Sequence, residues 1–330
     1  MLKDKVVLIT GGTGSFGRAC VEIILKNHRP KKIIIFSRDE LKQFDMAQAF
    51  PQDKYPVRYF LGDVRDKERL KWAFQGVDYI IHAAAMKQVP ASEYNPTESI
   101  KTNITGAENI VSVAADCGVK KVIALSTDKA VNPINLYGAT KLCAEKLFVA
   151  ANAFVGIKKC MYSVTRYGNV VGSRGSVIPL FFRKRDEGVL PVTHPDMTRF
   201  WITLPQSVEF VLQSLERMTG GETFIPKMPS LKIMDLARTI GPECRTEIIG
   251  VRQGEKIHET LISRDEARNT YEGDGYYIIE PDNSFFRSRV DHTHLKAVGE
   301  DFEYASNSNT RWMTPQEVNQ MIEPFSRGKK

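Results

Sequence analysis

The sequence contains few cysteines and no long apolar run, and both features exclude classes of protein. Its five cysteines are odd in number, widely spaced and never in a Cys-x-x-Cys pair: Cys20, Cys117, Cys143, Cys160 and Cys244. This pattern does not suit a disulfide framework or a zinc site and favours thiols in a reducing cytosol. No apolar run approaches the roughly eighteen residues that a membrane span needs. The first residues, "MLKDKVVLITGG", lack the pattern of a signal peptide, so we expect a cytoplasmic protein.

Long charged runs, repeats and metal-ligand clusters are also missing from the sequence. The formal net charge is +7, and its one short basic run is "RGKK" at 327–330, which favours an ordinary solvated surface over nucleic-acid binding. No group of residues has the spacing of a metal site or of a Ser-His-Asp arrangement. The content of 42% apolar and 26% charged residues is typical of a globular protein. We expect no nucleic acid, membrane or metal as a partner.

Short apolar runs alternate with amphipathic stretches in the first half of the chain. Strands are predicted at 5–10, 32–36, 57–62, 77–85, 121–127 and 161–168, and helical stretches include 98–117 and 136–154. Near-continuous Val/Ile runs indicate strands buried on both faces. The alternation predicts a doubly wound parallel α/β sheet of the Rossmann type.

After Gly168 this rhythm gives way to loops rich in Gly, Pro and Arg. We expect residues 1–168 to form a dinucleotide-binding domain, joined by an amphipathic helix near 205–217. Residues 169–330 would form most of a smaller α/β domain that closes over a ligand.

A glycine-rich turn, "LITGGTGSFG", follows the first predicted strand and places Gly11, Gly14 and Gly17 at G-x-x-G-x-x-G spacing. Such a turn brings the backbone close to a pyrophosphate and points a helix N-terminus at it. The strand-turn-helix context therefore predicts a dinucleotide site, although glycines can also serve helix-strand packing alone.

The residues at the end of the second predicted strand indicate whether the dinucleotide is NAD or NADP. It reads "IIIFSRDELKQ", so Ser37 and Arg38 stand where an NAD enzyme usually carries an acid. A hydroxyl and a guanidinium suit a 2′-phosphate, which favours NADP over NAD. Asp39 follows, and it could equally serve as a helix N-cap.

Three further positions extend the predicted cofactor site. Asp63 follows the third strand, where its carboxylate could accept a hydrogen bond from an adenine amino group, and the small residues of "HAAA" (82–85) leave room for the cofactor. Asn103 would be an ordinary helix-surface amide on the pattern alone.

Tyr137 and Lys141 lie one helical turn apart, so both point from one face. A lysine ammonium beside the phenol, with a cationic nicotinamide nearby, would lower the pKa of Tyr137 towards neutrality and make it a base for a sugar hydroxyl. Thr127 ends the preceding strand and could bond the same oxygen. A surface Tyr-Lys pair is the alternative.

These motifs resemble the extended short-chain dehydrogenase/reductase superfamily. More closely, the chain resembles the UDP-N-acetylglucosamine 4,6-dehydratases that invert C5, the first enzymes of pseudaminic acid synthesis. The resemblance spans nearly the whole chain and rests on "GGTGSFG", "FSRDELKQ", "HAAAMKQVP", "LSTDKAVNPINLYGATKL", "RYGNVVGSRGSV", "MTRFWIT", "GEKIHE" and "DFEYASNSN".

The resemblance implies a redox-neutral lyase with two acid-base groups beyond the Tyr-Lys pair. In such enzymes a tightly bound NADP takes hydride from C4, water is lost across C5 and C6, and the hydride returns to C6. Lys129 would be the base at C5 and Asp128 the acid at the C6 hydroxyl, which requires a neutral amine and a protonated carboxyl. A plain Asp-Lys ion pair is the alternative. Retaining relatives carry Asp-Glu here, so Asp-Lys favours inversion.

The resemblance also implies a nucleotide-sugar site. Arg199 and Arg252 would bind the pyrophosphate through planar guanidinium forks. Asn169 would reach the sugar or phosphates, Val177 would offer backbone groups to uracil, and Glu255 would accept from ribose hydroxyls. Surface ion pairs or loop caps are the alternatives.

The motifs and the resemblance together predict three sets of site residues. The catalytic residues are Thr127, Asp128, Lys129, Tyr137 and Lys141; the substrate residues are Lys87, Asn169, Val177, Thr193, Arg199, Arg252 and Glu255; and the NADP residues are Gly11, Thr13, Gly14, Ser15, Phe16, Gly17, Ser37, Arg38, Asp39, Lys42, Asp63, Val64, Ala84, Lys87, Asn103, Tyr137, Lys141 and Val170.

Two other functions stay open. A nucleotide-sugar epimerase or reductase of the same fold would share Tyr137 and Lys141, whereas a non-catalytic NADP-binding protein would usually lose one of them. The resemblance further implies a homo-oligomer, with 98–117 and 136–154 as candidate faces.

Overall fold

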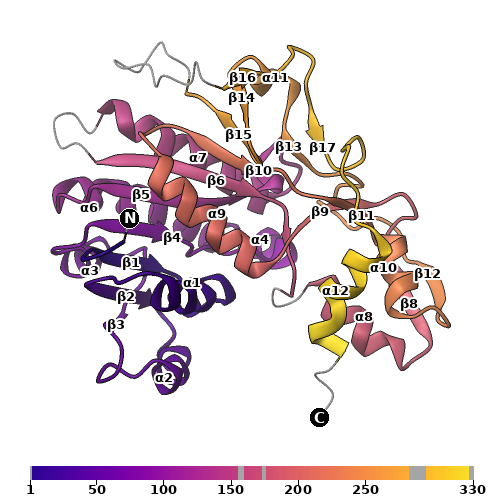
Figure 1. The fold of residues 1–330 in the computed structure, drawn as a ribbon, viewed down its shortest axis with the longest axis horizontal. Helices are drawn as coiled ribbons and strands as arrows, with labels where there is room; N and C mark the ends of the chain where they lie inside the picture. The colour runs from indigo at the N-terminus through magenta and orange to yellow at the C-terminus, as the bar shows by residue number, and fades with distance from the viewer. Residues whose placement is uncertain (1, 155–159, 173–175, 282–294, 327–330) are drawn as a thin grey trace.

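The computed structural model describes residues 2–154, 160–172, 176–281 and 295–326, and one large sheet dominates it (Figure 1). The sheet has ten strands in the order β16-β14-β15-β10-β6-β5-β4-β1-β2-β3. The strands from β3 to β10 in this order pair in parallel: β1 Val6–Thr10, β2 Lys32–Ser37, β3 Val57–Leu61, β4 Tyr79–His82, β5 Lys121–Thr127, β6 Met161–Tyr167 and β10 Thr223–Pro226. The order 3-2-1-4-5-6 within it is that of a Rossmann fold, which confirms the predicted fold class.

The six strands predicted in the first half are all present, but the fourth is shorter than predicted. It ends at His82, whereas the apolar pattern continued to residue 85. The reason lies in the glycine turn: a Cβ on Gly11 would stand only 2.9 Å from the Ala84 nitrogen. Residues 83–85 therefore leave the sheet and pass over the turn.

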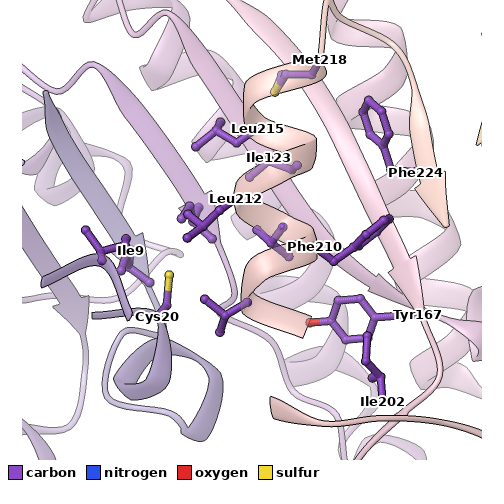
Figure 2. Close-up of a cluster of buried hydrophobic side chains, with 14 of the residues drawn as sticks. Ile9, Cys20, Ile123, Tyr167, Ile202, Phe210, Leu212, Leu215, Met218 and Phe224 are labelled. Carbon is purple, nitrogen blue, oxygen red and sulfur yellow. The ribbon is translucent and has the colours of Figure 1, made fainter. Parts of the chain in front are cut away.

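Helices cover both faces of the sheet and create two apolar cores. On one face lie α1 Ser15–Asn27 and α9 Leu204–Arg217, and on the other α3 Lys67–Ala73, α6 Gly106–Asp116 and α7 Leu136–Phe154. Helix α9 comes from the second half of the chain and packs against the first: Figure 2 shows Leu212 and Leu215 pointing from it to the side of Ile9 and Cys20, and Phe210 pointing to the side of Tyr167 and Phe224. Its apolar residues recur with helical spacing, so burial against the sheet accounts for the helix.

The predicted continuous helix over 98–117 is wrong in detail. The segment consists of α5 Pro96–Ile100, one turn of π-helix at Lys101–Thr105, and then α6. The π turn carries Asn103, whose amide bonds the main chain of Met86. Such a turn is common at functional sites. Hydrophobic periodicity could not predict it because it shifts the register by a single residue.

The second half of the chain adds strands to the large sheet and builds a separate apolar core. Strands β14 Thr270–Gly273, β15 Tyr276–Ile279 and β16 Lys296–Ala297 join the large sheet with antiparallel pairing. A third apolar cluster lies among α8, α10, α12 and β8, at the right of Figure 1. The predicted boundary at residue 168 stays a prediction.

The remaining elements are short. They are α2 Glu40–Ala49, α4 Val89–Tyr94, the 3-10 turn η2 Asp128–Ala130, β7 Asn169–Val170, α8 Val177–Arg185, β8 Val189–Val192, β9 Thr198–Ile202, β11 Ser230–Lys232, α10 Ile233–Ile240, β12 Arg245–Ile248, β13 Thr260–Ile262, α11 Arg264–Ala267, β17 Tyr304–Ala305 and α12 Pro315–Ser326. Within the described ranges, none of the helices is long and apolar enough to span a bilayer.

Candidate active site

A cavity of about 750 Å³ lies at the carboxyl ends of the parallel strands. Strand order reverses between β1 and β4, and this reversal is where α/β sheets bind their ligands. Most of the predicted cofactor residues line the cavity, namely Gly11, Thr13, Gly14, Ser15, Phe16, Gly17, Ser37, Arg38, Asp39, Lys42, Asp63, Val64, Ala84, Lys87, Tyr137, Lys141 and Val170. The residues that the sequence predicted to bind the cofactor therefore lie mostly along the wall of one cavity.

The glycine turn has the shape that a pyrophosphate requires. Gly11 has φ +64°, and a Cβ on Gly17 would stand 2.4 Å from the Gly12 oxygen, so the turn packs directly on α1. Gly14 is the N-cap of α1 and offers no side chain to its free N–H groups. These donors and the positive end of the helix dipole fit an anion at the cavity wall.

The residues predicted to recognise a 2′-phosphate stand at the mouth of the cavity. The Arg38 side chain is 60% exposed, and its Nη1 lies 3.8 Å from Asp63 Oδ2. Asp39 accepts a hydrogen bond from the Lys42 backbone nitrogen and caps α2, which confirms the alternative considered for it. The Ser37 hydroxyl is buried and accepts from Gln43 Nε2 at 3.0 Å.

Asp63 is held by a neighbour that the sequence did not single out. Arg65 donates to both Asp63 oxygens, with Arg65 Nε and Nη2 at 3.0 and 2.8 Å from Oδ2 and its backbone nitrogen at 3.0 Å from Oδ1. Burial favours the neutral acid, but the Arg65 bonds outweigh it and lower the pKa of Asp63. The carboxylate therefore stays ionised as an acceptor.

Asn103 does not line the cavity. Its Nδ2 donates to the Met86 carbonyl and to Thr140 Oγ1 at 2.9 Å, and its Oδ1 accepts from the Met86 nitrogen at 2.8 Å. The pattern placed it on a helix surface, but it is buried. Asn103 thereby holds the loop after β4 against α7 through hydrogen bonds.

Thr127, Asp128 and Lys129 stand where β5 ends and η2 begins. Thr127 Oγ1 donates to Asp128 Oδ1 at 2.9 Å, and Lys129 Nζ lies 3.0 Å from the same oxygen. Lys129 lines the cavity, whereas the Asp128 side chain is fully buried behind it. Among the described residues, no hydrogen-bond partner reaches Asp128 Oδ2.

The protonation expected for Lys129 is wrong for this structure. Burial and Arg199 both lower the pKa of the ammonium, but the Asp128 and Glu259 carboxylates outweigh them. The net pKa lies above the ordinary lysine value, so Lys129 is an ammonium in an ion pair. The sequence does not indicate that the Glu259 carboxylate lies beside Lys129.

Tyr137 and Lys141 project from the first turns of α7 into the cavity. Gly138 between them allows α7 to pack on η2, since a Cβ there would lie 2.1 Å from the Lys129 oxygen. Burial lowers the pKa of Lys141 to about 8, although Glu145 acts in the opposite direction.

The lowered Tyr137 pKa that we expected is also wrong. Burial raises the pKa of the phenol to about 12, against the opposing effects of the Lys129 ammonium and a hydrogen bond with Thr127. The nearby cation is thus Lys129, whereas the pattern had indicated Lys141.

Three of the predicted substrate residues line the cavity, and four do not. Lys87, Asn169 and Glu255 contribute to its wall, and within the described ranges Glu255 Oε2 is buried with no partner. Arg252 is exposed, whereas Val177 starts α8 and Thr193 is buried. Part of the motif that precedes Val177, residues 173–175, lies outside the described residues.

Arg199 is turned away from the cavity, contrary to its prediction as a phosphate ligand. Its guanidinium donates to the carbonyls of Thr198, Lys256 and Ile257 at 2.7 to 2.9 Å. The side chain is 6% exposed. An arginine fork suits carbonyl oxygens as well as phosphates, and sequence alone cannot distinguish the two.

Sequence reasoning missed Glu259, although it singled out the motif "GEKIHE" that ends in it. Glu259 Oε1 lies 3.2 Å from Lys129 Nζ. The same motif docks elsewhere on the stretch that holds Lys129: Asn135 Nδ2 donates to the Gly254 carbonyl at 2.7 Å, and Lys256 Nζ to the Val131 carbonyl at 2.6 Å. The acidic residue at the end of this motif was the sequence feature that could have identified Glu259.

The sheet order, the glycine turn and the Tyr-Lys pair on α7 define a protein of the short-chain dehydrogenase/reductase class. Within it, the chain belongs to the family described as "Polysaccharide biosynthesis protein", whose model matches residues 7–281.

Two named kinds of enzyme are found among the similar relatives. A Campylobacter jejuni protein named UDP-N-acetylglucosamine 4,6-dehydratase (inverting) is 54% identical over 98% of both chains. A Rickettsia akari protein named UDP-glucose 4-epimerase is 41% identical over 98% of this chain and 96% of its own.

Solved structures support the same fold. Pen from Bacillus thuringiensis matches with a TM-score of 0.90 and 36% identity over 99% of both chains. DesIV from Streptomyces venezuelae, a dTDP-glucose 4,6-dehydratase solved with NAD bound, matches with a TM-score of 0.68 and 22% identity over 76% of this chain and 86% of its own. The latter likeness concerns the fold.

Proposed function

We propose that the protein is a UDP-N-acetylglucosamine 4,6-dehydratase that inverts C5 and regenerates a tightly bound NADP in each turnover. Its product would be UDP-2-acetamido-2,6-dideoxy-β-L-arabino-hex-4-ulose, a precursor of pseudaminic acid or a related 6-deoxy amino sugar. The observation that carries this proposal is the Asp128–Lys129 pair, placed beside Tyr137 at one cavity wall. An epimerase or simple dehydrogenase does not need this second acid and base.

The residues of the cavity fit a nicotinamide dinucleotide. The close glycine turn and the uncapped α1 N-terminus suit its pyrophosphate. Ser37, Arg38 and Lys42 suit a 2′-phosphate, which supports NADP. When bound, the nicotinamide supplies a reversible hydride acceptor.

Each proton transfer of the reaction would then be carried out by a different side chain of the site. Tyr137 would remove the C4 hydroxyl proton once a bound cationic nicotinamide offsets the burial that raises the pKa of the phenol, and Thr127 would hydrogen-bond the same oxygen. The C4 ketone acidifies the C5 proton, which Lys129 would remove. Asp128 lies behind Lys129, so its proton would reach the departing C6 hydroxyl through the Thr127 hydroxyl, which lines the cavity and donates to Asp128 Oδ1.

The ion pair of Lys129 and Asp128 reconciles the observed geometry with these roles. Transfer of one proton from Lys129 Nζ to Asp128, across their 3.0 Å contact, yields a neutral amine and a carboxylic acid. These are the two states that the elimination requires. When Lys129 takes the C5 proton and Asp128 gives its own to the leaving water, the ion pair is restored without exchange with solvent. The proton that C5 regains on its opposite face, which sets the inverted configuration, comes from a further donor outside this pair.

The purified protein, incubated with UDP-N-acetylglucosamine and no added cofactor, should form the 4-keto-6-deoxy product. Proton NMR of that product should report the inverted C5, and mass spectrometry of the denatured protein should detect NADP. Conversion to UDP-N-acetylgalactosamine would instead identify an epimerase. Stoichiometric NADPH without a deoxy sugar would identify an ordinary dehydrogenase.

A further inference from the structure

We propose that Glu259 is a positioning residue of the elimination, which holds Lys129 against Asp128 and points it into the cavity. This inference rests on the proposed function. Lys129 Nζ lies between two buried carboxylates, 3.0 Å from Asp128 Oδ1 and 3.2 Å from Glu259 Oε1. The two carboxylates are 0% and 2% exposed, whereas the Lys129 side chain is 25% exposed and lines the cavity.

The geometry of the amino group explains why a second carboxylate matters. An ammonium has three N–H groups, and a neutral amine has two N–H groups and a lone pair. Asp128 and Glu259 occupy two of these positions, so one remains for the cavity. Proton transfer to Asp128 leaves the lone pair facing Asp128, so rotation about the Cε–Nζ bond brings it to the cavity position, where it would take the C5 proton while Glu259 keeps one N–H.

Glu259 is itself fixed by hydrogen bonds of its main chain within the fold. Its backbone nitrogen donates to Ser306 Oγ at 2.9 Å, and its carbonyl accepts from the Ser306 nitrogen at 2.8 Å. Ser306 Oγ also lies 2.7 Å from Thr198 Oγ1. The motifs "GEKIHE", "MTRFWIT" and "DFEYASNSN" thus meet at Glu259, and the last two would act by delivering its carboxylate to Lys129.

Charge provides a second role for Glu259. The charged or titratable groups around Lys129 are Asp128, Glu259, Arg199, Lys87, Lys256 and Tyr137. Glu259 raises the pKa of Lys129, as Asp128 does. Loss of the Glu259 charge should therefore let Lys129 lose its proton at a lower pH.

Two substitutions separate position from charge. Glu259→Gln keeps an acceptor oxygen and removes the charge, so the falling alkaline limb of the kcat–pH profile, where the Lys129–Asp128 pair loses its shared proton to solvent, should move to lower pH by about one unit or more. Glu259→Ala also removes the acceptor, so kcat should fall on the order of 10²-fold with little change in KM. Glu272→Gln, which removes a half-exposed carboxylate paired with Lys227, is the matched control and should change neither quantity.

A measurement independent of turnover keeps this inference distinct from the proposed function. Competitive reductive methylation followed by mass spectrometry should label Lys129 faster at neutral pH in Glu259→Gln than in the wild type or in Glu272→Gln. If the wild type forms no dehydrated sugar, the proposed function fails, and the labelling still decides the contact. Unchanged labelling and an unchanged pH limb in Glu259→Gln, or full kcat in Glu259→Ala, would overturn the role of Glu259.

Discussion

At the residue scale, Lys129 and Tyr137 should fail at different steps when they are replaced. Lys129→Ala should still allow slow oxidation at C4 but reduce formation of the deoxy sugar by about 10²–10⁴-fold, the usual contribution of a positioned acid-base group. Tyr137→Phe should stop the oxidation itself. Single-turnover absorbance at 340 nm, together with product NMR, separates the steps. Full turnover by Lys129→Ala would show that this lysine is not the base.

The sequence predicted the identity of these residues better than their protonation. Thr127, Tyr137 and Lys141 follow from a short local pattern, and the structure places all three at the cavity wall. The pKa values depend instead on groups that arrive from distant segments. Glu259, for example, comes from a segment whose Gly254 carbonyl accepts from Asn135, 119 residues away in the chain, and whose Glu259 main chain bonds Ser306.

At the scale of elements, the fit between the glycine turn and α1 should control cofactor binding. A Cβ on Gly17 would lie 2.4 to 2.6 Å from the backbone of Gly12, and backbone atoms cannot move aside as a flexible side chain can. Gly17→Ala should therefore push α1 away from the turn and weaken retention of the dinucleotide by at least about tenfold. Gly299→Ala, where a Cβ would meet nothing within 4 Å, is the control.

Cofactor content per protein, measured after gel filtration, checks this prediction. Equal retention by Gly17→Ala and Gly299→Ala would argue against it.

The sequence predicted the type of an element correctly where burial produces a regular apolar pattern. It predicted the element incorrectly where a single local contact changes the backbone. Strands β1, β2 and β5 are Val/Ile runs buried on both sides, so their pattern is unambiguous. The π turn at Lys101–Thr105 and the early end of β4 depend on single contacts of Asn103 and Gly11. Periodicity averages over several residues and does not register such contacts.

At the scale of the whole molecule, one largely buried ion network joins α7, which carries Tyr137 and Lys141, to the second half of the chain. Arg166 on β6 donates to Glu145 on α7 at 3.1 and 2.7 Å and to Glu266 on α11 at 3.1 and 3.0 Å. Glu145 follows Lys141 by one helical turn, so this network also fixes the helix face that carries Tyr137 and Lys141. The sequence did not indicate it, because its members belong to three separate segments.

Removal of Arg166 should therefore destabilise the entire fold. Arg166→Met leaves the buried Glu145 and the partly buried Glu266 without their cation and should lower the free energy of unfolding by about 3–5 kcal/mol. Urea denaturation followed by circular dichroism measures this loss. Arg311→Met, which breaks an exposed pair with Glu317, should cost less than about 1 kcal/mol.

The same network sets a direction for the dependence of stability on pH. Burial raises the pKa of Glu266, but Arg166 outweighs it and lowers the pKa below the ordinary value of 4.5. A carboxyl whose folded pKa is lowered stabilises the protein above its unfolded pKa and loses that contribution as the pH falls through the folded value. The wild type should therefore lose stability below about pH 4.5 more steeply than Glu266→Gln, in urea titrations at pH 7 and pH 4. Parallel losses in the two proteins would mean that Glu266 is not an ionised partner of Arg166.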